Sequence, residues 1–563
     1  MIQKVFHPTA ERYLFLAAVS LNALPVLLFR FFPSMDGAAH LYNSRLILEL
    51  LFGGTETIRS FYEFTPVPVP NWLGHFILSS GLLVLPAFMA EKVLLVLYAV
   101  GLPYAFRHLV RTVGPNNIEY SYFILPFCYS YLFTLGFYNF SLAIMIMFLV
   151  LAKWLRLEKV PHRSFGQVSG LATLLLLLYF AHIFVFGLTL FLLAFLSFMS
   201  SFRCIRWSAA WLNEMYRSML PKALSLAGAA FIPLLLSVVY YLNMPKALEY
   251  TFVSRSELVE WVFNLRPLIS YNIELEGVYT RQIFSVLVIF SIATFLSGAW
   301  RTFRHHKERT STYRQELLSI STWWAICLIF LFLYLLMPDG NGVAGYMSIR
   351  LGLLLLMFVL VALSLHRVPK WSIWSAIVLM MIPYSSLWKY HIAVIKDQNR
   401  IAKNIELAGE YLSPGSVVYP VNRSNNWLAP HYSNYLGVNR PVVILENYEA
   451  GLGYFPLQWN STMMPAMRIG PVWLADLEHE FRLTKVNGMG EQVDHIFVLR
   501  DGDQGNENDD FLELVLPYYD LIYSNEDCLL YRSKGDHVSN DREAEFPRSA
   551  YRTSNQMLDH LRL

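Results

Sequence analysis

The chain has 563 residues, of which 55% are hydrophobic and 15% are charged, and its mean hydropathy is +0.40. Soluble domains are roughly 45–50% apolar and about 25% charged, so this composition indicates a membrane protein. The formal net charge of +3 is divided unevenly, with 31 basic and 18 acidic residues in 1–400 against 13 and 23 in 401–563. These features exclude a secreted enzyme, a disordered chain and a cytosolic nucleic-acid binder, so no nucleic-acid partner is expected.

Apolar runs that could cross a membrane fill residues 13–388. A helix needs about 20 apolar residues to cross the hydrocarbon core, and the sequence offers eleven candidates. The first is expected to be retained, because no small-residue cleavage site follows it. The predicted spans are 13–32, 90–109, 119–135, 138–154, 167–182, 183–201, 223–242, 282–300, 317–336, 351–366 and 371–388.

Basic residues set the predicted orientation of these spans. With the N-terminus in the cytoplasm, 19 of the 31 basic residues before position 401 fall in the inner loops, as the positive-inside rule requires. The odd number of spans then places the C-terminal part on the outer side. The absence of targeting signals favours a multi-pass protein of the bacterial inner membrane.

The first outer loop, 33–89, is predicted to hold two interfacial helices near 37–52 and 72–85. The Pro-rich stretch 65–70 separates them as an extended link. Residues 72–89 are apolar enough to span, but a span there would invert all later loops. This stretch is therefore predicted to lie along the outer membrane surface.

After residue 388 the composition becomes that of a soluble protein. Helices are predicted near 393–412 and 471–485, and the polar tail 535–563 is predicted to be disordered. Short β-type runs occur at Ser416–Val421, Pro441–Glu446, His495–Arg500, Asp520–Ser524 and Cys528–Arg532. The predicted fold is thus a polytopic α-helical membrane protein of about eleven transmembrane helices (1–388) with a small C-terminal extracytoplasmic α/β domain (389–534).

The first outer loop opens with the sequence FPSMDGAAHLYNSRL. Asp36 follows the first span directly, and a helix starting there would put His40 on the same face. Asp36 is either the N-cap of this helix, where an acidic residue is favoured, or a catalytic carboxylate with His40 as its partner or as a metal ligand. A cap can also be a base, so the two hypotheses are compatible.

This layout resembles the GT-C superfamily of membrane glycosyltransferases, which includes protein O-mannosyltransferases and the aminoarabinose transferases of lipid A. Those enzymes have a short cytoplasmic start, a first span, and a large outer loop with an acidic residue at its beginning. The resemblance implies a polyprenyl-phosphate sugar donor and a role for Asp36 as general base. The chain departs from the pattern at Met35-Asp36-Gly37, where many members have adjacent acidic residues, and the role of His40 stays open.

Transfer from such a carrier needs cations that stabilise the leaving phosphate. Arg350 follows the Gly-rich loop at the outer mouth of the tenth span, so it is either the phosphate ligand or a snorkelling interfacial cation. Further substrate-binding candidates lie at the same depth or in outer loops, although each could equally stabilise a turn or be solvated. They are His182, Tyr138, Asn139, Glu276, Arg281 and Glu63, the last as a second carboxylate.

Together with this resemblance, the sequence predicts a hexosyl- or pentosyltransferase at the outer face of the membrane. It would move a polyprenyl-phosphate-linked sugar to a glycan, lipid or protein acceptor and would contact membrane lipid. Two other classes stay open: a transporter or flippase for a lipid-linked glycan, and a non-catalytic membrane anchor with an outer binding domain. A transporter should place ionisable residues near mid-membrane, whereas the charges here gather at the boundary. A divalent metal ion is the one cofactor considered, with His40 and Asp36 as candidate ligands.

Overall fold

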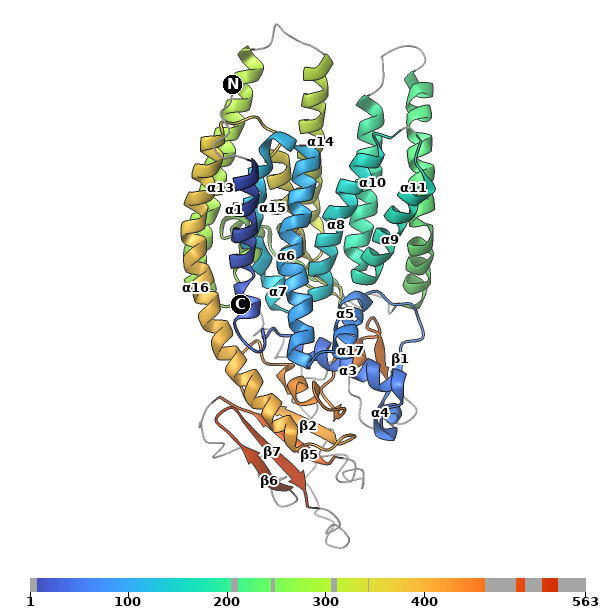
Figure 1. The fold of residues 1–563 in the computed structure, drawn as a ribbon, viewed down its shortest axis with the longest axis vertical. Coiled ribbons are helices and arrows are strands. Elements are labelled where there is room, and N and C mark those ends of the chain that lie inside the picture. The colour runs from blue at the N-terminus through green and yellow to red at the C-terminus, as the bar shows by residue number, and fades with distance from the viewer. Residues whose placement is uncertain are drawn as a thin grey trace.

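The computed structural model describes residues 8–160, 162–203, 211–244, 249–304, 311–342, 344–460, 493–501 and 519–534. A long helical bundle carries the C-terminal strands at one end (Figure 1). The predicted fold class, a polytopic helical membrane protein with a small C-terminal α/β part, is confirmed.

Seven helices in the described part of the chain are long and apolar enough to cross a membrane, and two shorter helices are apolar. Each coincides with a predicted span, while the total of eleven spans stays a prediction. The seven are α6 (Ala87–Val113), α8 (Tyr138–Leu157), α10 (Ile183–Arg203), α11 (Trp211–Asn243), α13 (Ile273–Arg304), α14 (Ser311–Leu336) and α16 (Lys370–Ala408), and the shorter two are α9 (Phe165–Ala181) and α15 (Met347–Leu363).

The other two predicted spans are helical but not single α-helices. The first is divided into α1 (Pro8–Asn22) and α2 (Leu24–Leu27). The third is the 3₁₀ helix η1 (Pro115–Tyr129), which is kinked at Asn117 and is followed by the single turn α7 (Tyr131–Thr134). A 3₁₀ helix rises about 2.0 Å per residue against about 1.5 Å in an α-helix, so the part of η1 after the kink is longer than an α-helix with the same number of residues.

The helix η1 lies in the core of the bundle. All of its residues from 120 to 129 are buried, and it packs against α6, α15 and α16. Pro126 lies inside it and has no N–H for a helical hydrogen bond. An apolar run alone does not reveal such a change of helix type.

The first loop contains the two predicted helices. The first, α3 (Gly37–Phe52), has the predicted bounds, whereas α5 (Trp72–Leu82) ends before 85. With 11 residues, α5 is too short to cross a membrane, and Pro86 separates it from α6. A short helix, α4 (Glu56–Phe61), and strand β1 (Tyr62–Phe64) lie between them, and α12 (Arg255–Phe263) and η2 (Arg266–Leu268) occupy a later loop.

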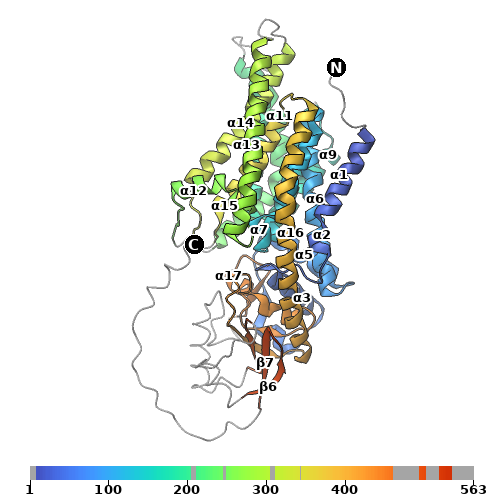
Figure 2. The same cartoon turned by 90° about the vertical axis from the view of Figure 1, so that its left-hand side faces the viewer.

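The boundary predicted at residue 388 falls inside α16. This helix has 39 residues and joins the predicted span 371–388 to the helix expected near 393–412. It runs from the bundle to the strands (Figures 1 and 2). The bundle and the C-terminal part are therefore connected by a continuous helix and not by a linker.

All five predicted β-runs contribute strands to one sheet. Its order is β3-β2-β5-β7-β6, in which β2 is parallel to β3 and β5, while β7 is antiparallel to β5 and β6. The strands are β2 (Val417–Asn422), β3 (Val443–Ile444), β5 (His495–Leu499), β6 (Tyr519–Ser524) and β7 (Cys528–Ser533). The predicted helix 471–485 and the tail 535–563 lie outside the described residues.

The chain after β2 folds back onto the first loop. The short helix η3 (Gly409–Tyr411) precedes β2, and η4 (Tyr432–Gly437) and α17 (Glu449–Leu452) follow it. Strand β4 (Leu457–Trp459) pairs antiparallel with β1 in a second sheet that the sequence did not predict. Asn43 of α3 and Asn447 exchange two side-chain hydrogen bonds of 2.9 and 2.8 Å. The first loop and segment 431–459 thus form one unit, which contains the candidate site.

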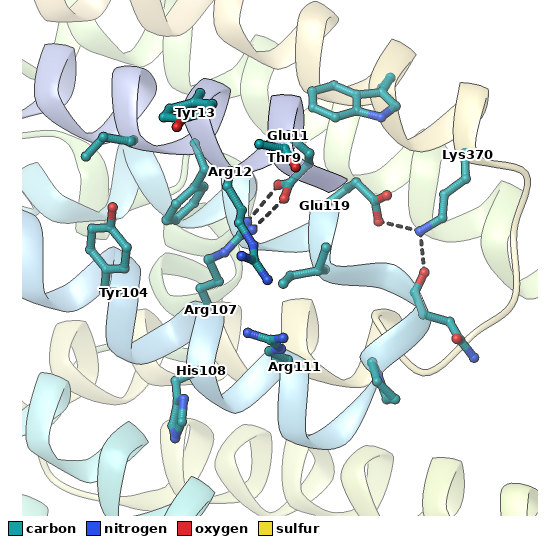
Figure 3. Close-up of a pocket in the computed structure, with 16 residues that line it drawn as sticks. Thr9, Glu11, Arg12, Tyr13, Tyr104, Arg107, His108, Arg111, Glu119 and Lys370 are labelled. Carbon is teal, nitrogen blue, oxygen red and sulfur yellow. Dashed lines mark hydrogen bonds and ion pairs between the residues drawn. The ribbon is translucent and has the colours of Figure 1, made fainter. Parts of the chain in front are cut away.

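At the opposite end of the bundle, α1, α6, η1 and α16 line a cavity of about 830 Å³ (Figure 3). Arg107 donates two hydrogen bonds of 2.8 and 2.5 Å to the carboxylate of Glu11. Lys370 is paired with Glu119 across the same cavity. Both carboxylates in this cavity are therefore matched by a cation.

Candidate functional site

Asp36 occupies the N-cap position of α3, but its side chain makes no capping hydrogen bond. Its backbone N–H bonds the carbonyl of Leu135 at 3.0 Å, which docks the start of α3 on the turn before α8. The side chain is buried, with 6% of the residue exposed. Asp36 therefore has the position of a cap, while its carboxylate is left to interact with other groups.

Gly136 allows this close docking. Its φ is +86°, and a Cβ there would lie 2.9 Å from both the Cβ and the backbone N of Asp36. Only glycine fits such a position without strain. The carbonyl of Gly136 lies 2.9 Å from Nε2 of His40, so one residue positions both predicted catalytic side chains.

His431 is a basic group within ion-pair distance of Asp36. Its Nε2 lies 3.8 Å from Oδ1 of Asp36, and its Nδ1 is paired with Glu446. Glu446 is held in turn by hydrogen bonds from Ser433 and Asn434. The ring of His431 stacks on Tyr448 at a centroid distance of 4.1 Å. A carboxylate, an imidazole and a second carboxylate thus form a chain that ends at Asp36.

Burial and neighbouring charges act in opposite directions on these groups. Burial raises the pKa of Asp36 above its usual value, and the charges of His431 and His40 offset this only in part. Burial lowers the pKa of His431, but Glu446 and Asp36 more than compensate, so this pKa is raised. The two carboxylates that face His431 thus shift it toward its protonated form.

His40 is not paired with the side chain of Asp36. Its Nδ1 lies 2.6 Å from Oε1 of Glu449, and the other oxygen of Glu449 lies 2.8 Å from Nε2 of His75. Burial would raise the pKa of Glu449, but His40 and His75 lower it to about 2. The cluster of possible metal ligands in the described chain is thus His40, His75 and Glu449, in place of the predicted pair His40 and Asp36.

Arg350 lies in the first turn of α15, where a loop residue holds the helix start: Asp339 accepts a hydrogen bond from the N–H of Ser348 at 2.9 Å. The guanidinium contacts Nε2 of His182 at 2.7 Å. Arginine can only donate, so Nε2 of His182 is unprotonated. The guanidinium also lies over the rings of Phe137 and Phe140, with its Cζ 4.7 and 5.0 Å from their centroids.

Arg350 carries a buried charge without an acidic partner within ion-pair distance among the described residues. Its Nε is buried and has no hydrogen-bond partner in the described chain. The charge of Asp339 acts on Arg350, as does, less strongly, that of Asp36, and the charges of Asp36 and Arg350 both act on the hydroxyl of Tyr454. The structure therefore brings the two leading predicted residues into one neighbourhood, with an N–H donor left open.

Tyr138 and Asn139, at the start of α8, support this neighbourhood. The hydroxyl of Tyr138 bonds Ser34, two residues before Asp36, at 2.8 Å. Asn139 accepts the N–H of Gly74 at 2.7 Å and donates to the carbonyl of Asn71 at 3.0 Å. Asn139 thus fixes the start of α5, the helix that carries His75.

The remaining three predicted residues have other neighbours. Glu276 is buried and accepts hydrogen bonds from three successive backbone N–H groups and lies 3.1 Å from His391. Arg281 is exposed and bonds Asn264 at 3.2 Å. Glu63 is exposed on β1 and bonds Gln458 at 2.7 Å. The described interactions link none of the three to Asp36.

The sequence interpretation missed the C-terminal half of the site. His431, Glu446, Tyr448, Glu449 and Tyr454 all come from segment 431–455, far along the chain from Asp36. The stretch ENYEAGLGYF at 446–455 combines acidic and aromatic residues between two strands, and this was the available signal. His75, in the predicted interfacial helix, could have been grouped with His40.

No protein family model and no curated protein matches the chain. It is similar in structure to ArnT from Cupriavidus metallidurans in the apo state, with 11% identity, a TM-score of 0.42, and coverage of 93% of this chain and 98% of that chain. For ArnT bound to undecaprenyl phosphate the values are 12%, 0.43, 95% and 100%.

An oligosaccharyltransferase from Archaeoglobus fulgidus, solved with Zn and sulfate, is also similar. Its identity is 13% and its TM-score is 0.36, over 92% of this chain and 73% of that chain.

Proposed function

We propose that this protein is a glycosyltransferase that takes a sugar from a polyprenyl-phosphate carrier. The reaction would occur at the membrane boundary next to the C-terminal sheet, which is the outer face in the predicted topology. Asp36 acts as general base and Arg350 binds the phosphate. The observation that carries the proposal is the joint placement of a buried carboxylate that makes no capping hydrogen bond and a buried guanidinium without an acidic partner within ion-pair distance in the part of the chain that the structure describes.

Each of these groups has one task in the reaction. Asp36 takes the proton of an acceptor hydroxyl as its oxygen attacks the anomeric carbon of the sugar. The bond from that carbon to the phosphate oxygen breaks, and the polyprenyl phosphate leaves with the electron pair. Arg350 stabilises the leaving phosphate through charge-assisted hydrogen bonds, for which its open Nε and guanidinium plane are suited.

The surroundings of both residues support these roles. His182 accepts a hydrogen bond from Arg350 and fixes one side of the guanidinium without neutralising it. His431 faces Asp36 at 3.8 Å and, when protonated, favours the ionised carboxylate that a base requires. A cation held by neutral and aromatic groups is prepared for an anionic ligand, whereas a cation in a complete ion pair is not.

The first experiment measures binding of undecaprenyl phosphate to the purified protein in detergent. Undecaprenol, which lacks the phosphate, is the matched ligand control. We expect saturable binding of the phosphate and at least about tenfold weaker binding of the alcohol, since charge-assisted hydrogen bonds contribute about 1.5–3 kcal/mol. Equal binding of both lipids would contradict the assignment of Arg350.

The second experiment distinguishes transfer from transport. Undecaprenyl-phosphate-linked sugars are incubated with the protein and candidate acceptors, and released undecaprenyl phosphate is measured by mass spectrometry. A glycosyltransferase breaks the sugar–phosphate bond, whereas a flippase moves the intact lipid across the membrane of proteoliposomes. Translocation without bond cleavage would overturn the proposal in favour of a transporter.

A further inference from the structure

His40, His75 and Glu449 come from three separate segments and meet in the buried interior. His40 lies on α3, His75 on α5 and Glu449 on α17. Their exposed fractions are 5%, 0% and 1%, and one possible ligand atom of each lies within 4.8 Å of the other two. The cluster joins the first loop to the C-terminal segment.

The hydrogen-bond donors and acceptors of this cluster do not match if His40 and His75 are neutral and Glu449 is ionised. His40 places Nε2 2.9 Å from the carbonyl of Gly136, and His75 places Nδ1 3.1 Å from the carbonyl of Asn71. A carbonyl oxygen only accepts, so each of these nitrogens must carry the proton. In a neutral imidazole the other nitrogen then carries a lone pair and no proton. In both residues that nitrogen faces Glu449.

Two lone pairs directed at one carboxylate repel it unless a positive charge lies between them. Two imidazolium ions would provide this charge, but they would leave a net positive charge in a cluster that is almost completely buried, which is costly. The contact of His40 with Glu449 is also not a hydrogen bond. Although the two atoms are 2.6 Å apart, Nδ1 of His40 and Oε1 of Glu449 have no hydrogen-bond partner in the described chain.

We propose that His40 Nδ1, His75 Nε2 and the carboxylate of Glu449 bind one divalent transition-metal ion, and that Zn²⁺ fits this donor set best. Zn²⁺ takes imidazole nitrogen and carboxylate oxygen in tetrahedral sites, often with a fourth position open. Ligand atoms around one such ion lie about 3.3 Å apart for bonds of about 2.0–2.1 Å. The three atoms therefore need only small shifts to receive the ion.

The second shell has the arrangement expected of a metal site. A histidine that binds a metal usually donates its other N–H to a carbonyl or carboxylate, which fixes the ring. Both histidines do so here, and both carbonyls belong to residues with positive φ, +86° at Gly136 and 66° at Asn71. Asn139 holds the carbonyl of Asn71 through a 3.0 Å hydrogen bond. The backbone is thus turned to orient the two rings.

This inference goes beyond the proposed transfer reaction and does not depend on it. The ion would connect α3 and α5 to the segment that supplies His431 and Glu446. It would also hold α3 at the turn where Asp36 begins. Its role is that of a clamp that assembles the site from distant parts of the chain.

The test uses the full-length protein with a tag that contains no histidine, purified without chelators and analysed for metals by mass spectrometry. We expect about one equivalent of zinc per chain. His75→Ala and Glu449→Gln should lose it, while His75→Cys, which restores a zinc ligand, should retain it. His391→Gln is the matched control, because His391 is another buried histidine that contacts a glutamate.

Two further measurements keep the result independent of folding defects and of activity. Cobalt added to the chelated wild-type protein should give the visible absorption bands of a four-coordinate Co²⁺ site, absent in Glu449→Gln. Asn139→Ala should weaken zinc binding by roughly 10–100-fold, the usual effect of losing an outer-shell partner. The proposal is overturned if the wild-type protein neither contains nor binds a transition metal, or if Glu449→Gln binds zinc as tightly as the wild type.

Discussion

The two ends of the bundle contain similar ionisable groups in opposite states of pairing. In the cavity far from the sheet, Glu11 is matched by Arg107 and Glu119 by Lys370 (Figure 3). At the end next to the sheet, Arg350 instead donates to a neutral histidine, and Asp36 faces His431 at 3.8 Å without a direct hydrogen bond from it. At the first end both carboxylates are matched by a cation of the protein. At the second, among the described residues, Arg350 has no acidic partner within ion-pair distance and Asp36 lies 3.8 Å from its cation, so these two groups stay available to a ligand.

This difference indicates where function is located. Buried charges that are fully paired satisfy one another and add order to the fold. Buried charges that stay open cost stability, and a protein retains them where they contact a substrate. The far cavity is also rich in basic residues, which are among those on which the predicted orientation rests. It is lined by Arg12, Arg107, Arg111 and Lys370, as expected of a cytoplasmic end.

The largest expected effect is that of Asp36→Asn. The amide keeps the size of the side chain but cannot take a proton, so transfer should fall by roughly 10²–10⁴-fold. Because the carboxylate makes no capping hydrogen bond, the free energy of unfolding should change by well under about 1 kcal/mol. Release of polyprenyl phosphate and thermal unfolding measure the two quantities.

Glu63→Gln is the control for this change, since Glu63 is an exposed carboxylate of the same loop. It should leave transfer unchanged. A fully active Asp36→Asn protein would remove Asp36 from the role of base, and an equal loss in both variants would indicate a general effect of loop charge.

Arg350→Lys should have the next largest effect. Lysine keeps the charge but loses the planar fork and the contact with the two aromatic rings, so binding of undecaprenyl phosphate should weaken by about 10–100-fold. Arg281→Lys is the matched control on an exposed arginine near the same end. Unchanged lipid binding by Arg350→Lys would place the phosphate elsewhere.

A change at the far end should affect stability and not binding. Glu11→Ala leaves the partly buried guanidinium of Arg107 without its carboxylate, which should lower the free energy of unfolding by roughly 1–3 kcal/mol. Undecaprenyl phosphate should bind as before. The double variant Glu11→Ala/Arg107→Ala should recover part of the loss, because no charge is then left unpaired. Weaker lipid binding by Glu11→Ala would show that the two ends are coupled.

Sequence reasoning located the half of the site that is local in the chain. Asp36 is recognisable because a polar residue ends an apolar run, and Arg350 because it follows a Gly-rich loop at the mouth of another. The bounds of α3 follow from Gly37 at its start and from Gly53 after its end, in the left-handed conformation typical of a helix C-terminus. Each of these signals lies within a few residues of the feature it predicts.

The other half of the site depends on contacts between distant segments. His75 and Glu449 are 374 residues apart, and no periodicity or spacing connects them. The strand pair β1 and β4 is equally remote, with Tyr62 opposite Trp459. The prediction of a separate domain after 388 also directed attention away from this segment, whereas the continuous helix α16 brings it back onto the first loop. Packing, and not pattern, decides such contacts.

The smallest expected effect is a dependence of stability on pH that reports the protonation of His431, the histidine opposite Asp36. Burial lowers the pKa of His431, but Glu446 and Asp36 raise it further, with Glu449 in the same direction, so its folded value lies above the unfolded value of about 6.5. A raised pKa means that the folded state binds the proton more tightly than the unfolded state. The stabilisation is therefore complete below about pH 6.5 and is lost as pH rises through the folded value. Thermal unfolding of the wild-type protein should show this decline, and His431→Gln should show a smaller one, because the pKa of His40 is also raised. The difference between the two curves isolates His431 from other titrating groups. Parallel curves would mean that His431 is neutral in the folded protein. Asp36 would then have no cation opposite it, and the contrast in ion pairing between the two ends of the bundle would be lost.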